Sequence, residues 1–308
     1  MLLFWIAAAA LLLCLLTAFV CFLIGFYSPP RKPLPEGQID LPEGEIYEPF
    51  HPAMKRWAEE ARALPQEPVQ ITTPDGLTLR GIYYEFSPDA PVEIMVHGYR
   101  GNSERDMSGG VQRCFRLGHS ALIVDQRASG KSDGSVITFG IREHQDCLLW
   151  LDYVLRRFGP DVRVILTGIS MGAATVMMTA DKNLPENVMG ILADCGYTSP
   201  KDIILEVIPK MKLPAKLMYP FVRLGAILFG HFDPEADSPG KALQNSTVPV
   251  IFFHGDGDDF VPCAMSRENF GVCASRKKLV IVPGAGHGLA YPTDIEGYLK
   301  EVKEFFAE

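Results

Sequence analysis

Several features typical of nucleic-acid-binding or disordered proteins are missing from this sequence of 308 residues. Lys and Arg number 29 against 37 Asp and Glu, the net charge is −8, and no run rich in Lys and Arg occurs. Because proteins that bind nucleic-acid phosphates usually carry a basic patch or stripe, we expect no nucleic-acid partner. Low-complexity tracts are absent too, and 47% of the residues are hydrophobic. This composition excludes a disordered chain and suffices for a large core.

The cysteines form no recognisable pattern. There are seven, an odd number, with no Cys-x-x-Cys pair and no Cys/His spacing that matches a zinc site. Cys14 and Cys21 lie in an N-terminal apolar run, and the other five are scattered along the chain. We therefore expect free thiols rather than a disulfide framework, and neither a metal nor an organic cofactor is implied.

Charged side chains are also missing from Met1–Tyr27. About 20 apolar residues cross a hydrocarbon core, so this segment predicts a single transmembrane anchor. A cleaved signal peptide would have a basic start, a shorter apolar stretch and a small-residue cleavage site. Nothing basic precedes this run, which ends in Gly25-Phe26-Tyr27-Ser28-Pro29-Pro30. We expect residues 1–27 to be an uncleaved anchor that the large domain after it does not need for folding.

A stretch rich in Pro, Gly and acidic residues follows, and we interpret residues 28–50 as a linker. Arg31 and Lys32 come directly after the apolar run. By the positive-inside rule they favour a cytoplasmic position for the large domain, and the free thiols agree with that compartment.

Residues 51–308 read as one α/β domain. It begins with a helix near Met54–Leu64 and a hairpin, Val69–Thr73 and Leu77–Phe86, around Pro74-Asp75-Gly76. Short apolar strands then alternate with helices, which indicates a mostly parallel sheet with helices on both faces. The expected strands are Val92–Val96, Ala121–Asp125, Arg163–Thr167, Gly190–Asp194, Pro249–His254 and Lys278–Val282. The expected helices are Glu104–Leu117, Arg142–Phe158, Met171–Asp181, Met265–Val272 and Ile295–Phe306.

The gap between Asp194 and Pro249 is too long for one crossover. It holds two apolar, helix-like stretches, Ile203–Ile208 and Leu217–Leu228, and three prolines that should break them, at positions 209, 214 and 220. We predict a helical lid insertion at about residues 197–247.

The sharpest motif is Gly168-Ile169-Ser170-Met171-Gly172, between an expected strand and an expected helix. A serine nucleophile needs a tight strand-to-helix turn with strained backbone angles, and only small residues fit two positions before and after it. The helix N-terminus behind it favours developing negative charge. Ser170 is therefore the candidate nucleophile.

A serine also needs a base, and the base needs an orienting acid. His287 follows the last expected strand in a glycine-rich loop, whereas His231 lies in the insertion and His254 ends a strand. His287 is therefore the candidate base. The loop after the preceding strand offers Asp256, Asp258 and Asp259 for the acid; we favour Asp258 and place Asp256 second, although spacing alone does not separate them.

Together these motifs resemble the α/β-hydrolase superfamily, and in particular bacterial serine hydrolases with a His-Gly-x-x-Asp-x-x-Val-Pro segment followed by a Gly-His loop. Here that segment is His254-Gly255-Asp256-Gly257-Asp258-Asp259-Phe260-Val261-Pro262, which selects Asp258. The resemblance runs from about Val69 to Phe306. It also implies that His97-Gly98-Tyr99 is the oxyanion loop, with the backbone N–H of Tyr99 and of Met171 as the two donors.

Another segment, Asp125-Gln126-Arg127-Ala128-Ser129-Gly130-Lys131-Ser132, resembles the family's Asp-x-Arg-Gly-x-Gly-x-Ser loop. It departs from that pattern at Ala128, which puts the geometry of the turn in question. Its last three residues, Gly-Lys-Ser, could end a phosphate-binding loop. That loop needs Gly where Asp125 stands, so we reject this interpretation. The aspartates after residue 255 lack the spacing and closing Glu of an EF-hand.

The sequence therefore predicts a membrane-anchored serine hydrolase that cleaves an ester or thioester of a small-molecule or lipid-like acyl substrate. The resemblance also permits a serine peptidase of the prolyl-oligopeptidase type, in which Glu59 and Glu60 could hold a substrate amino terminus. A non-catalytic binding protein on the same fold is a third possibility, and an intact Ser, Asp and His set argues against it.

Overall fold

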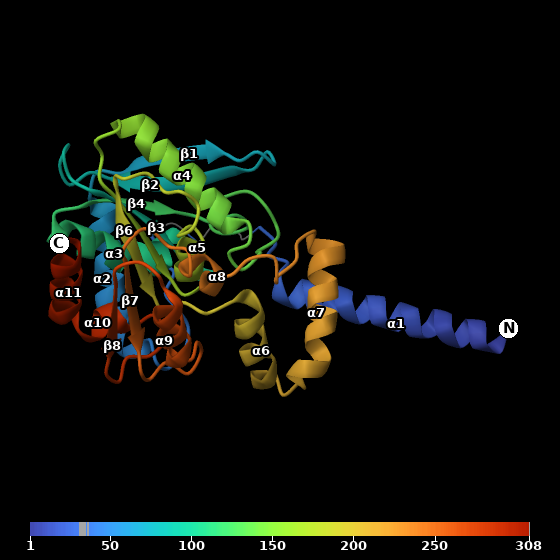
Figure 1. The fold of residues 1–308 in the computed structure, drawn as a ribbon. Coiled ribbons are helices and arrows are strands. Elements are labelled where there is room, and N and C mark those ends of the chain that lie inside the picture. The colour runs from blue at the N-terminus through green and yellow to red at the C-terminus, as the bar shows by residue number, and fades with distance from the viewer. Residues whose placement is uncertain (31–34, 36, 308) are drawn as a thin grey trace.

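A mixed eight-stranded sheet lies at the centre of the computed structural model, which describes residues 1–30, 35 and 37–307 (Figure 1). The strand order is β1-β2-β4-β3-β5-β6-β7-β8. β2 pairs antiparallel with β1 and β4, and every later pair is parallel. The strands are β1 (Glu67–Thr72), β2 (Thr78–Tyr84), β3 (Val92–Val96), β4 (Ser120–Val124), β5 (Val164–Ile169), β6 (Val188–Asp194), β7 (Val250–Gly255) and β8 (Lys277–Val282).

Helices cover both faces of this sheet. Trp150 and Leu243 pack against one face of the sheet, and Trp57 and Tyr298 pack against the other face. The first layer contains α4 (Glu143–Phe158), α5 (Met171–Met177), α8 (Pro239–Leu243) and α9 (Cys263–Val272). The second contains α2 (His51–Ala63), α3 (Ser103–Leu117), α10 (Ala290–Thr293) and α11 (Ile295–Ala307), and a short 3-10 turn, η1 (Glu48–Phe50), precedes α2. The predicted α/β-hydrolase fold is confirmed.

Two local expectations differ from the structure. α5 ends at Met177 instead of Asp181, because the next residues form tighter turns in which Ala180 N–H donates to Met177 O and Lys182 N–H to Thr179 O. Pro209 and Pro220 lie inside helices rather than between them. The break falls at residues 211–214, where Lys212 has a φ of 60° and Pro214 precedes the next helix.

The insertion between β6 and β7 forms two lid helices, α6 (Pro200–Lys210) and α7 (Ala215–Gly230), beside the carboxyl ends of the strands (Figure 1). The rest of the predicted insertion does not belong to the lid, because α8 packs on the main core through Ala242 and Leu243. The lid has a hydrophobic core of its own. Phe22 of the N-terminal helix and Phe26, just after that helix, contribute to this core.

That N-terminal helix, α1 (Leu2–Gly25), extends away from the body of the molecule (Figure 1). Its 24 residues give a length of about 36 Å at 1.5 Å per residue, and it is long and apolar enough to cross a membrane by length and composition. Its last turns lie against α7 and the α/β domain. The sequence predicted an anchor separate from that domain, whereas the structure packs the two together. Arg31 and Lys32, on which the predicted orientation rests, and with them part of the predicted linker, lie outside the described residues.

Candidate active site

Ser170 occupies the sharp turn between β5 and α5 with φ 56° and ψ −118°. A positive φ is uncommon for a residue other than glycine and marks a strained position. The turn requires glycine on both sides. A Cβ on Gly168 would lie 2.1 Å from Gly172 O, and one on Gly172 would lie 2.0 Å from Val96 O. The Gly-x-Ser-x-Gly spacing therefore follows from the close approach of three backbone segments.

Ser170, His287 and Asp258 lie within hydrogen-bonding distance in series. His287 Nε2 is 2.9 Å from Ser170 Oγ, and His287 Nδ1 is 2.8 Å from Asp258 Oδ2. When Nδ1–H donates to the carboxylate, Nε2 is left free to accept the serine proton. The Asp258 carboxylate is fully buried and the imidazole is 13% exposed. This arrangement has the geometry of a nucleophile, a general base and an orienting acid.

Asp258, rather than Asp256, faces His287. Asp258 Oδ1 accepts the backbone N–H groups of Phe260 and Val261 at 2.9 and 2.8 Å. Asp256 turns away and accepts the N–H of Gly284. Burial by itself raises the pKa of Asp258, but hydrogen bonds from the two neighbouring histidines and from Val261 outweigh it and hold that pKa well below its usual range. Asp258 therefore stays ionised throughout the neutral pH range.

The second histidine partner of Asp258 is His254, to which the sequence assigned no role in the site. It is completely buried, and its Nε2 lies 3.1 Å from Asp258 Oδ2 and 2.9 Å from Val261 O. Its Nδ1 lies 2.7 Å from Ser266 Oγ. His254 thus fixes the loop that carries the acid. The sequence feature that could have indicated this role is the position of His254 at the end of a strand, four residues before Asp258.

The loop after β3 lies directly against the nucleophile. A Cβ on Gly98 would be 3.5 Å from Ser170 Cβ, so the backbone of the predicted oxyanion loop passes beside the serine. Met171 is the first residue of α5, where backbone N–H groups have no partner within the helix. The Tyr99 side chain has another role, because its hydroxyl donates to Gly25 O at the end of α1.

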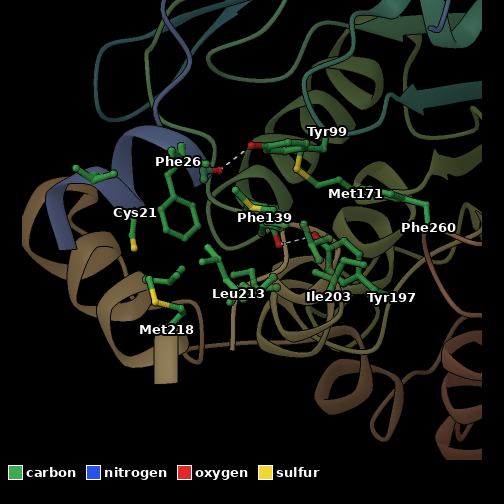
Figure 2. A pocket seen from close by; sticks show the side chains of 18 of the residues that line it. Cys21, Phe26, Tyr99, Phe139, Met171, Tyr197, Ile203, Leu213, Met218 and Phe260 are labelled. Atoms are coloured by element: carbon green, nitrogen blue, oxygen red, sulfur yellow. Dashed lines mark hydrogen bonds between the residues drawn. The ribbon is translucent and has the colours of Figure 1, made fainter. Parts of the chain in front are cut away.

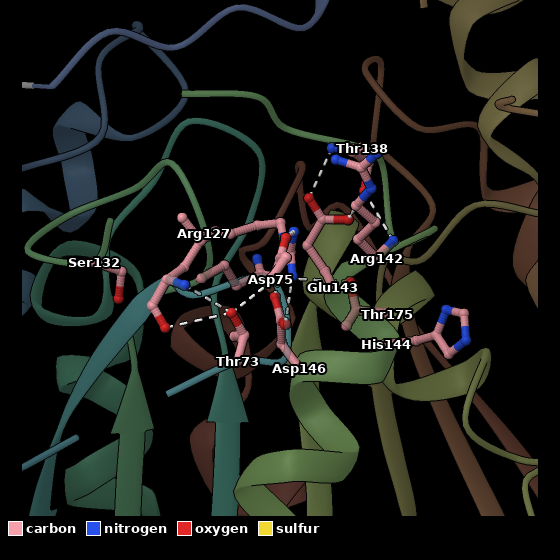
Figure 3. Close-up of polar contacts among 12 residues, drawn as sticks. Thr73, Asp75, Arg127, Ser132, Thr138, Arg142, Glu143, His144, Asp146 and Thr175 are labelled. Carbon is pink, nitrogen blue, oxygen red and sulfur yellow. Dashed lines mark hydrogen bonds and ion pairs between the residues drawn. The ribbon is translucent and has the colours of Figure 1, made fainter. Parts of the chain in front are cut away.

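The loop that resembles the family's Asp-x-Arg segment is held by a buried ion pair (Figure 3). Arg127 donates to both carboxylate oxygens of Asp146 at 2.6 and 2.7 Å, and both side chains are 6% exposed. Arg127 also donates to Asp75 at 3.0 Å. Ala128 keeps the backbone conformation that glycine favours, with φ 57°, so the departure from the family pattern leaves the turn intact.

Two cavities meet at Ser170. The first has a volume of about 420 Å³ and an almost wholly apolar lining, contributed by α1, the lid helices and the residues around the serine (Figure 2). The second has a volume of about 440 Å³ and lies beside His287, covered by residues 42–47. Ser170 and Tyr99 line both cavities.

The charged side chains that line the second cavity are mostly acidic. Its carboxylates are Glu43, Glu45, Asp106 and Asp259. Its cation, Arg105, donates to Asp106 at 2.7 Å. This wall was not predicted, because residues 28–50 have the composition of a linker. Carboxylates outnumber cations here, so the cavity disfavours an anionic ligand.

Other candidate groups are less suited to chemistry. Cys195, Asp258 and His287 offer ligand atoms within 4.8 Å of one another, the spacing of a metal site. Both ring nitrogens of His287 already have partners, however, at 2.9 Å from Ser170 Oγ and 2.8 Å from Asp258 Oδ2. Glu59 and Glu60 are exposed on α2, where they pair with neighbouring cations of the same helix.

Comparisons with known proteins agree with this architecture. Residues 92–227 match a family model described as the alpha/beta hydrolase fold. YqkD of Bacillus subtilis is 24% identical over 232 residues, 75% of each chain. The membrane protein YNL320W of Saccharomyces cerevisiae is 23% identical over 194 residues, 63% of this chain and 62% of the yeast protein. The solved structure of Pyrococcus furiosus esterase Pf2001 superposes with a TM-score of 0.69 at 20% identity, covering 92% of this chain and 97% of the esterase.

Proposed function

We propose that this chain, which has the α/β-hydrolase fold and matches the alpha/beta hydrolase family model over residues 92–227, is a serine hydrolase that cleaves an ester or thioester through an acyl-enzyme. The observation that carries the proposal is the position of His287, whose two ring nitrogens lie 2.9 Å from Ser170 Oγ and 2.8 Å from Asp258 Oδ2. The esterase name of the Pyrococcus structural relative agrees with it.

The mechanism follows from this geometry. Ser170 Oγ attacks the carbonyl carbon of the substrate while His287 Nε2 takes the serine proton, and ionised Asp258 stabilises the imidazolium. The backbone N–H groups of Tyr99 and Met171 are the proposed donors to the tetrahedral oxyanion. His287 then gives its proton to the leaving alcohol or thiol as the bond to the carbonyl carbon breaks. A water molecule, deprotonated by His287, attacks the acyl-enzyme and releases the acid and free Ser170.

We further propose that α1 stays on the mature protein as its membrane anchor. Phe26, just beyond α1, is 1% exposed and its carbonyl accepts the N–H of Ile137. Cleavage of the segment would therefore remove part of the lid core. The free state of all seven cysteines agrees with a cytoplasmic catalytic domain. Protease added outside sealed vesicles that enclose the cytoplasmic face should then leave the domain intact. Degradation of the domain would show that it lies on the opposite side of the membrane.

Steady-state kinetics test the proposed reaction. The purified protein should hydrolyse p-nitrophenyl butyrate, and an aminoacyl p-nitroanilide should be a poor substrate. His287→Asn should lower kcat by about 10⁶-fold, as the loss of a catalytic histidine does. His231→Asn is the matched control, because His231 lies on the exposed end of α7, away from the serine. Faster turnover of the anilide than of the ester would favour the peptidase, and equal activity of the two variants would refute the assignment of the base.

A further inference from the structure

The large apolar cavity beside Ser170 is enclosed on one side by the N-terminal helix (Figure 2). Thr17, Cys21 and Ile24 of α1 line it, and they recur at the spacing of one helix face. Met218 and Val222 of α7 also line it, as do Ser170 and Met171. Without α1, this cavity would be an open groove on the lid.

The contact between α1 and α7 is close and specific. A Cβ on Gly225 of α7 would lie 2.2 Å from Ala18 O, so glycine allows the two backbones to touch. Phe229 packs against Phe19 and Phe22 with ring centroids 5.0 and 6.0 Å apart. At the end of the helix, Tyr99 and Arg100 donate to carbonyls of α1 and the residues after it. Because of these contacts, α1 is a fixed wall.

The lid surface next to this cavity has the composition of a membrane-facing segment. Met211 and Leu213, which also line the cavity, are exposed in the turn between the lid helices, and Leu217 is exposed at the start of α7. The exposed lysines at 212 and 216 lie beside them in the sequence. Exposed apolar side chains beside cations are typical of segments that lie at a bilayer interface. With α1 across the bilayer, the turn between the lid helices would lie at the surface of the same bilayer.

We propose that α1 and α7 form a long-chain acyl site and that the substrate is an ester or thioester of a membrane lipid or lipidated molecule whose chain enters from the bilayer. This inference rests on the proposed serine hydrolase activity. The chain would lie in the cavity that residues of α1, α6 and α7 line, with its carbonyl carbon at Ser170, and the polar leaving group would lie in the second cavity. A methylene is about as large as a water molecule, which takes about 30 Å³ of liquid, so 420 Å³ holds on the order of a dozen carbons.

The test compares two tryptophan variants on the same turn of α1. Cys21→Trp places an indole in the cavity, whereas Leu23 is exposed and does not line the cavity, so Leu23→Trp is the matched control. Both are assayed in detergent micelles with p-nitrophenyl esters of two to sixteen carbons. Cys21→Trp should lower the ratio of dodecanoate to acetate turnover at least tenfold. Leu23→Trp should retain the wild-type chain-length profile.

The outcomes separate the two proposals. If the wild type hydrolyses these esters and Cys21→Trp changes no chain length more than Leu23→Trp does, the acyl site is refuted and the serine hydrolase stands. If the wild type hydrolyses no ester, both are refuted. A variant that fails to fold would lose the acetate activity as well. In that case the wild type, labelled with a dodecyl fluorophosphonate carrying a terminal diazirine, gives the answer. Crosslinks to residues 16–26 or 204–222 support the site, and crosslinks confined to residues 42–47 refute it.

Discussion

Removing the N-terminal helix should damage the catalytic domain, and the damage should depend on where the truncation ends. Phe22 and Phe26 are 6% and 1% exposed in the lid core. Losing each costs about 2–3 kcal/mol of burial. The hydrogen bonds that Gly25 O and Phe26 O accept from Tyr99 and Ile137 add about 1 kcal/mol each. Deletion of residues 1–27 should therefore lower the free energy of unfolding by roughly 6–8 kcal/mol.

A shorter deletion is the control. Residues 1–15 are almost all exposed and contribute no residue to the lid core, so their removal leaves the buried turns in place. At about 2–4 °C per kcal/mol for a chain of this size, the long deletion should lower Tm by roughly 12 °C or more, and the short one by less than about 2 °C.

The assay is thermal unfolding in detergent micelles, followed by circular dichroism, with turnover of p-nitrophenyl acetate and dodecanoate on the same samples. The long deletion should also lose dodecanoate turnover, because the cavity becomes an open groove. If the two deletions have the same Tm and the same ratio of dodecanoate to acetate turnover, the helix is only an anchor and the reasoning fails.

Three further predictions follow from the site and its support. Asp258→Asn should lower kcat by about 10⁴-fold because the imidazole loses its orienting acid, and Asp256→Asn by less than tenfold; equal losses in ester assays would show that the acid is misassigned. Arg127→Met should destabilise the protein by about 3–5 kcal/mol in urea unfolding, because it leaves Asp146 buried without its cation; a change below about 1 kcal/mol would contradict the buried pair. Burial raises the pKa of Asp194 to about 6, against about 3.9 in an unfolded chain. The contribution of Asp194 to stability is therefore fully present below about pH 4 and is lost as the pH rises through 6. The Tm of Asp194→Asn should accordingly rise relative to that of the wild type between pH 4 and pH 8, and a constant difference in Tm would rule this out.

The sheet and the nucleophile turn could be predicted because their signals are local. Buried parallel strands read as apolar runs, and Val92–Val96 has the same bounds in sequence and structure. The glycines at 168 and 172 follow from steric limits that any side chain would violate. Both results come from short stretches in which backbone geometry determines the residue type.

The walls of the site could not be predicted in this way. Nearly every residue of Leu2–Gly25 is apolar, so no stripe marks the face that meets α7, and the contact depends on Gly225, about 200 residues away. Residues 42–47 form a loop at the site. A loop has no helical or strand period, so the sequence of these residues does not indicate where they lie. Spacing alone did not separate Asp256 from Asp258, and the choice of Asp258 came from the family pattern. The three-dimensional turn shows that the Asp258 carboxylate is the one directed toward His287.

The most direct test of the central claim is the site of covalent labelling by a small fluorophosphonate. Mass spectrometry of the intact protein should show one adduct, and peptide mapping should place it on Ser170. Ser170→Ala should remain folded and unlabelled, and His287→Asn should be labelled far more slowly because the serine proton has no acceptor. An adduct on another residue, or undiminished labelling of Ser170→Ala, would contradict the account.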